Sequence, residues 1–92
     1  MVMVGRPTLR NPGGERVLEP GDCILLPEGP EGAHQITNRS DEVVRVLVVS
    51  NFTLPRAAVQ PDSGKMMIRW DAGPTDSLWF RRVDAADYWD GE

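Results

Sequence analysis

The chain has 92 residues, enough for one domain with a single modest core, and 14 acidic against 10 basic residues give it a net charge of −4. Because the basic residues form no run and include only one lysine, Lys65, the sequence lacks the basic footprint of a nucleic-acid-binding protein, and we expect no nucleic-acid partner. The chain has no apolar run of membrane-spanning length and no signal-peptide core, and its single cysteine, Cys23, lacks an intrachain partner, so we expect a cytoplasmic protein with no membrane partner.

Short segments rich in valine, leucine and isoleucine alternate with glycine and proline along the chain. Turn-forming residues at such regular intervals are typical of an all-β sandwich or barrel. The segments that we expect to form strands, in chain order, are 2–4, 7–10, 15–18, 22–26, 33–38, 43–50, 57–60 and 65–70. Turn-forming residues should close hairpins at 11–14, 38–42 and 61–64.

Three later segments lead to further expectations. Segment 43–50, "VVRVLVVS", is apolar at nearly every position apart from Arg45, which predicts a strand buried on both faces, either in the core or at a subunit contact. In segment 83–89, Asp84 could cap a single helical turn. The tail, 73–92, is dense in aromatic residues, which is unusual for a disordered segment, so we expect it to pack on the rest of the chain or on a partner.

The only histidine of the chain, His34, follows a turn rich in glycine and proline. Gly21 would let the chain turn into a strand, and Pro27 would end that strand. Gly29 and Gly32 would supply tight or left-handed backbone before the return strand begins at the histidine.

Alternation along the return strand puts His34, Ile36 and Asn38 on one face. If Ile36 points into a β-barrel, His34 does so as well. We therefore treat this face as the candidate site.

The order of these residues resembles the second conserved motif of the cupin superfamily, in which a Pro/Gly turn leads to a strand carrying one histidine, with an asparagine four positions later. The stretches "RPTLRNPGGERVLEPGD", "PDSGK" and "DYWDGE" extend the similarity to small bacterial cupin-domain proteins over roughly residues 5–92. The resemblance implies a cupin-type double-stranded β-helix, a jelly-roll-like barrel, formed by residues 1–72, with the aromatic tail 73–92 docked on it. The turn before His34 is longer than in the usual motif, which leaves the alternation of the return strand intact.

The first cupin motif is missing from this sequence. In metal-binding cupins it supplies two histidines, one residue apart, and a glutamate; here the chain begins near the end of that motif, at about Gly5, and holds no second histidine. The expected barrel is therefore shortened at its N-terminus. His34 is the single candidate metal ligand, whereas a transition-metal site needs about three or four.

Other donor side chains are poorly placed to replace the missing ligands. Cys23 is out of phase with Ile24 and Leu26 on its expected strand, so its thiol should point away from the face of His34. Glu28 and Glu31 lie in the turn, where loop carboxylates make poor preorganised ligands.

We expect a cupin-domain protein of unknown specific activity that binds a small molecule or has a structural role, without a complete metal site and with no residue assigned to catalysis. The residues expected at the barrel mouth are His34, Asn38, Ile36 and Leu26. Whether the chain is an enzyme stays open. One alternative is a metal-dependent dioxygenase or isomerase that uses Fe, Mn, Ni or Zn, with the missing ligands supplied by a partner or by an unassigned N-terminal extension. Another is a protein that joins a larger assembly through its aromatic tail.

Association is also expected from the shortened sheet. A cupin-like sheet without its first strands has an unpaired edge and partly covered apolar faces, which proteins cover rather than leave in water. The apolar N-terminus, "MVMV", can pair with the edge of another chain. We therefore expect a homodimer formed by strand or edge pairing, with a small molecule as the other partner.

Overall fold

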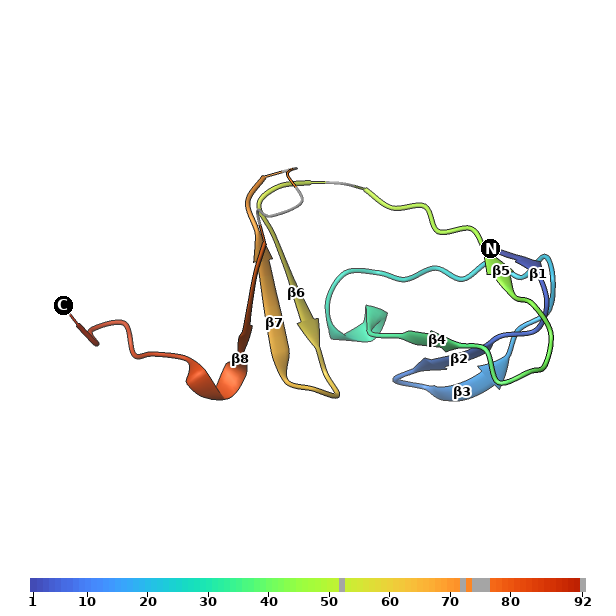
Figure 1. Cartoon of the computed structure of the whole chain (residues 1–92), viewed down its shortest axis with the longest axis horizontal. Coiled ribbons are helices and arrows are strands. Elements are labelled where there is room, and N and C mark those ends of the chain that lie inside the picture. Colours follow the sequence, from blue (N-terminus) through green and yellow to red (C-terminus); the bar gives the residue numbers. More distant parts are fainter. Residues whose placement is uncertain (52, 72, 74–76, 92) are drawn as a thin grey trace. The chain divides into compact units, whose positions relative to one another are not determined.

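The computed structural model describes residues 1–51, 53–71, 73 and 77–91. Its secondary structure consists of short antiparallel strands in three small sheets, together with two turns of 3₁₀ helix (Figure 1). The all-β class is therefore confirmed, and the described strands form no closed barrel. The chain divides into two compact units, Met1–Ser50 and Asn51–Glu92, each described here by itself.

The first unit contains two sheets. A two-stranded sheet pairs β1 (Val2–Val4) with β5 (Arg45–Val46). A three-stranded sheet has the order β3-β2-β4, and its strands are β2 (Thr8–Asn11), β3 (Gly14–Val17) and β4 (Gln35–Thr37).

The β2–β3 connection is the hairpin predicted at 11–14. Asn11 and Gly14 are its last paired residues, and the Asn11 side-chain oxygen accepts a hydrogen bond from the Gly13 backbone N–H at 3.0 Å. Gly14 has a φ of 120°, a conformation that glycine adopts without steric cost. The turn chemistry of the sequence therefore predicts this connection correctly.

A small core holds the first unit together. Val2, Leu9 and Leu18 are almost fully buried, and Ile24 packs against them. Backbone hydrogen bonds join β1 to the segment that carries Ile24, since the Val2 N–H donates to Asp22 O at 2.9 Å and the Gly21 N–H donates to Val2 O at 2.8 Å. The first residues of the chain are thus part of the core.

The Met1 backbone extends the β1–β5 ladder by one position. The terminal ammonium of Met1 donates to Leu47 O at 2.8 Å, and the Leu47 N–H donates to Met1 O at 2.9 Å. This pair lies beyond Val2 and Val46, which are partners in the ladder.

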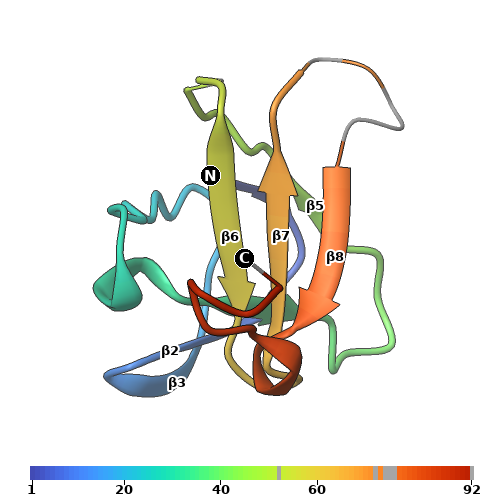
Figure 2. The ribbon, with the colours of Figure 1, turned by 90° about the vertical axis from the view of Figure 1, so that its left-hand side faces the viewer.

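The second unit is a three-stranded antiparallel meander in the order β6-β7-β8, in which the strands lie side by side (Figure 2). Its strands are β6 (Arg56–Gln60), β7 (Lys65–Arg69) and β8 (Ser77–Arg81). The hairpin predicted at 61–64 is confirmed, and Gly64 in this turn has a φ of 66°. A 3₁₀ turn, Arg82–Asp84, follows β8.

The C-terminal tail contains a strand that the sequence did not predict. β8 pairs with β7 along its whole length, from Lys65 opposite Arg81 to Arg69 opposite Ser77. The predicted boundary at 72/73 falls inside the second unit, between β7 and β8. Asp84 lies at the end of the 3₁₀ turn, so its expected role as a helix N-cap is wrong.

Two expected strand features of the first unit are wrong. Segment 22–26 forms no ladder, although its side chains alternate as a strand's would: Ile24 and Leu26 are half-buried, whereas Cys23 and Leu25 are exposed. The turn at 38–42 exists but closes no hairpin, because β4 belongs to the β3-β2-β4 sheet and β5 pairs with β1.

The apolar segment 43–50 is not a buried core strand within this chain. Only Arg45–Val46 forms a strand, and the exposed fractions of Val48 and Val49 are 73% and 85%. Val46 pairs with Val2 and Leu47 hydrogen-bonds to Met1, whereas no described strand pairs with residues 48–50. In the described part of the chain, no helix is long and apolar enough to cross a membrane.

Candidate functional site

The turn before His34 is closed by glycine. Gly29 has a φ of 86° and precedes the 3₁₀ turn η1 (Pro30–Gly32), in which the Gly32 N–H donates to Gly29 O at 3.0 Å. A Cβ atom at Gly32 would collide with the backbone carbonyl oxygen of Pro27. The expectation of left-handed backbone at Gly29 and tight backbone at Gly32 is thus confirmed.

His34 lies directly after this turn and is exposed. Its Nδ1 atom lies 2.8 Å from Gly32 O. Because a carbonyl oxygen only accepts hydrogen bonds, Nδ1 carries the proton in the neutral ring, and the lone pair is on Nε2. The turn therefore orients the imidazole and assigns Nε2 the role of acceptor or metal ligand.

Asn38 lies just beyond β4, and its amide holds the following turn together. Its Oδ1 atom accepts hydrogen bonds from the backbone N–H and the hydroxyl of Ser40, at 3.0 Å and 2.6 Å, and its Nδ2 donates to Glu42 O at 2.8 Å. His34 and Asn38 thus hydrogen-bond to two different turns. The observed contacts of Asn38 belong to the chain's own backbone and Ser40.

The two apolar candidates occupy different segments. Ile36 lies on β4 opposite the buried Leu9 of β2, and its exposed fraction is 37%. Leu26 is half-buried in the segment before the His34 turn. Three of the four candidates therefore lie on β4 or next to its ends, and Leu26 lies on the preceding connection.

The donor side chains around the site form no metal-binding cluster that the structure describes. Cys23 is exposed, and its thiol lies 3.8 Å from Gly21 O. Among the described residues, no group of three or more His, Cys, Asp or Glu side chains could hold a metal ion. Among the described residues, His34 is thus a single candidate ligand, whereas a transition-metal centre needs about three or four.

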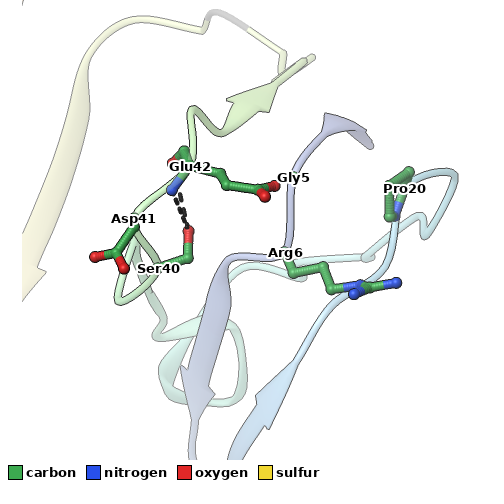
Figure 3. A pocket seen from close by; sticks show the side chains of 6 residues that line it. All are labelled: Gly5, Arg6, Pro20, Ser40, Asp41 and Glu42. Atoms are coloured by element: carbon green, nitrogen blue, oxygen red, sulfur yellow. Dashed lines mark hydrogen bonds between the residues drawn. The ribbon is translucent and has the colours of Figure 1, made fainter.

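A second feature, which the sequence did not predict, is an open hollow of about 530 Å³ in the first unit. Its lining residues are Gly5, Arg6, Pro20, Ser40, Asp41 and Glu42. Figure 3 shows the Glu42 side chain extending toward Gly5, while the Arg6 guanidinium extends away from Ser40. Arg6 pairs with Glu19 at 3.0 Å, so its charge is already compensated outside the hollow.

Gly5, at the edge of the hollow, lies very close to the backbone of Val43 and Val44. This residue has a φ of 83°, and a Cβ atom there would lie 2.6 Å from Val43 O, closer than side chains tolerate. The hollow depends on the Asn38 turn as well, because Ser40 and Glu42 belong to both. The sequence signal for this feature was the glycine at position 5.

An ion pair joins Glu15 of β3 to Arg39, the residue that follows Asn38. Arg39 donates from Nη1 and Nη2 to the two carboxylate oxygens of Glu15, at 2.7 Å and 3.1 Å. The hydrogen bond from Arg39, followed by its positive charge, lowers the pKa of Glu15, and the same contacts raise the pKa of Arg39. Both side chains are substantially exposed, so solvent weakens the pair.

Comparisons with known proteins give no match: no family model fits the chain, and no significant similarity to a curated protein or a solved structure is found.

Proposed function

We propose that this chain is a cupin-type module that binds a small molecule or has a structural role, without a complete metal site of its own. The observation that carries the proposal is the orientation of His34. Its Nδ1 atom is held by Gly32 O at 2.8 Å, and Nε2 keeps its lone pair at an exposed ring. An oriented imidazole can accept a hydrogen bond from a ligand.

Further support comes from the turn that places this ring. Gly29 and Gly32 adopt the backbone that a tight Pro/Gly turn needs, and the return strand β4 starts one residue after His34. These features support the proposed second cupin motif. A single exposed cysteine, Cys23, fits a reducing compartment, so we also propose a cytoplasmic location.

Three forms of the protein test the role of His34: the natural chain, His34→Ala and His34→Asn. Asparagine places an amide nitrogen near the position of Nδ1, so it can keep the bond to Gly32 O while it removes Nε2. We expect native mass spectrometry to show a bound small molecule on the natural chain and none on either variant. The free energy of unfolding should fall in His34→Ala and stay close to the natural value in His34→Asn.

Two results would contradict the proposed ligand site. One is a bound molecule that both variants retain, and the other is a natural chain that copurifies with no small molecule. The latter would leave the structural role as the remaining part of the proposal.

A metal-dependent enzyme is the second candidate. The bond from Nδ1 to a backbone carbonyl is an arrangement that metal-ligating histidines use, since it fixes the ring and the tautomer. The described side chains supply no further ligands, so a partner or an N-terminal extension would have to provide them. Elemental analysis decides between the candidates: stoichiometric Fe, Mn, Ni or Zn that disappears in His34→Asn would favour the enzyme.

Association into a homodimer by strand or edge pairing is the last part of the proposal. Residues 48–50 follow the Met1–Leu47 pair, and the valines Val48 and Val49 are exposed. An apolar segment of this kind can add to the edge of another chain as a strand.

A further inference from the structure

The β6-β7-β8 sheet has one face made entirely of apolar side chains. In the observed register, Ala57 lies opposite Ile68, which lies opposite Leu78, and Val59 lies opposite Met66, which lies opposite Phe80. Directly paired residues project to the same face of a sheet. We call this six-residue surface the apolar face.

The opposite face of the same sheet is different in charge. Its side chains are Arg56, Arg69 and Ser77; Ala58, Met67 and Trp79; and Gln60, Lys65 and Arg81. Lys65 Nζ lies 5.9 Å from the centre of the Trp79 ring, a cation–π contact within this face. Four basic side chains therefore suit this face to water, and none lies on the apolar face.

Within the second unit, large parts of the apolar face are left exposed. The exposed fractions are 53% for Val59, 59% for Leu78, 41% for Ile68 and 37% for Phe80. A contiguous apolar surface of this kind marks an interaction site, because water around it costs free energy.

The three-stranded sheet of the first unit has no face of matching character. On one of its faces, the row Arg16, Leu9 and Ile36 contains a charged residue, and Leu9 is already buried in the core. The other face of that sheet includes Arg10 and Glu15. A second copy of the chain does offer a match, since its own apolar face is uncharged and of the same size.

We propose that the apolar face packs against the apolar face of a second copy, sheet on sheet, in a two-fold symmetric dimer. The inference rests on the dimer proposed above but assigns the contact to a sheet face rather than to a strand edge. Two copies contribute six apolar side chains each and no charge, whereas contact through the opposite faces would bring eight basic side chains together.

Adjacent positions on β8 provide a matched test in the full chain. Leu78 lies on the apolar face and Trp79 on the opposite face, and their exposed fractions are 59% and 51%. A lysine at either position reaches water in a single chain. At position 79 it also removes the Lys65–Trp79 contact, an effect within one copy that does not depend on the dimer. Leu78→Lys should weaken the dimer about tenfold or more, because it buries an unpaired charge, while Trp79→Lys should leave the dissociation constant nearly unchanged.

Sedimentation equilibrium from micromolar to submillimolar concentration measures these constants. Val59→Lys, on the far edge strand of the same face, should weaken the dimer as Leu78→Lys does, and unchanged circular dichroism should show that the variants fold. A natural chain that stays at the 10.2 kDa mass of one copy would overturn the inference. A dimer that Leu78→Lys and Val59→Lys both leave intact would also overturn it, while dimerisation by edge pairing would remain possible. Neither result bears on the binding test at His34.

Discussion

Gly32 connects the backbone of the candidate turn to the orientation of His34. Its carbonyl accepts the Nδ1 hydrogen bond, and its Cα lies so close to Pro27 that a side chain has no room. Gly32→Ala should therefore lower the free energy of unfolding by about 1–3 kcal/mol and release the imidazole. Denaturant titration measures the first effect, and nitrogen-15 NMR of the ring measures the second through the populations of its two neutral tautomers.

Gly13 supplies the matched control for this substitution. A Cβ atom there would meet only the end of the Asn11 side chain, at 3.3 Å, which can move aside. Gly13→Ala should thus be close to neutral, with the tautomer of His34 unchanged. Equal losses of stability in the two variants would show that the close approach of Gly32 to Pro27 does not exclude a side chain at position 32.

The Glu15–Arg39 pair makes a prediction about pH. Because the folded chain holds the pKa of Glu15 below its ordinary value, its contribution to stability is fully present above the pKa of the unfolded chain. That contribution disappears as the pH falls through the lower pKa of the folded chain. Arg39→Ala should raise the pKa of Glu15 toward the ordinary value and reduce this acid dependence slightly, since both side chains are exposed.

Carboxyl carbon NMR titration of Glu15 measures this change directly. Arg6→Ala is a suitable control, because Arg6 pairs with Glu19 instead. An unchanged Glu15 pKa in Arg39→Ala would mean that the bidentate contact does not persist in solution.

At the scale of elements, β8 makes the C-terminal segment part of a sheet. Removal of residues 73–92 would take away the partner of β7 and leave its edge unpaired, so we expect the truncated chain to lose strand content and aggregate. Removal of 82–92 alone spares all three strands and should leave the sheet intact. Circular dichroism and light scattering compare the two truncations; equal behaviour would argue that β8 contributes little.

The strands also show where sequence patterns succeed. Both β2–β3 and β6–β7 were predicted, because their turns contain residues suited to positive φ and connect neighbouring segments. The core strand expected at 43–50 is wrong because an apolar pattern indicates a preference for burial, whereas a strand also needs a hydrogen-bonding neighbour, and no described strand pairs with residues 48–50. β8 was missed because the aromatic residues Trp79 and Phe80 were interpreted as docking groups rather than as strand formers.

At the scale of the molecule, the sequence predicted the all-β class but not the division at Ser50 and Asn51. Turn residues specify connections between neighbours in the chain, while the pairing of β1 with β5 joins positions far apart, which no local pattern encodes. The same holds for the site. The role of the glycines around His34 could be predicted. The hydrogen bonds of the Asn38 side chain to Ser40 and Glu42 depend on a turn geometry that the sequence leaves open. The cupin-type barrel stays a prediction.

The ladder pair between Met1 and Leu47 has a practical consequence for experiments on assembly. Any residue added ahead of Met1 would replace its ammonium by an amide and would come next in the ladder, opposite Val48. An affinity tag at that end would therefore lengthen β1 along the exposed valines and compete with a partner strand for the same hydrogen-bonding groups. Self-association should therefore be compared between protein that starts at Met1 and protein with added residues ahead of it.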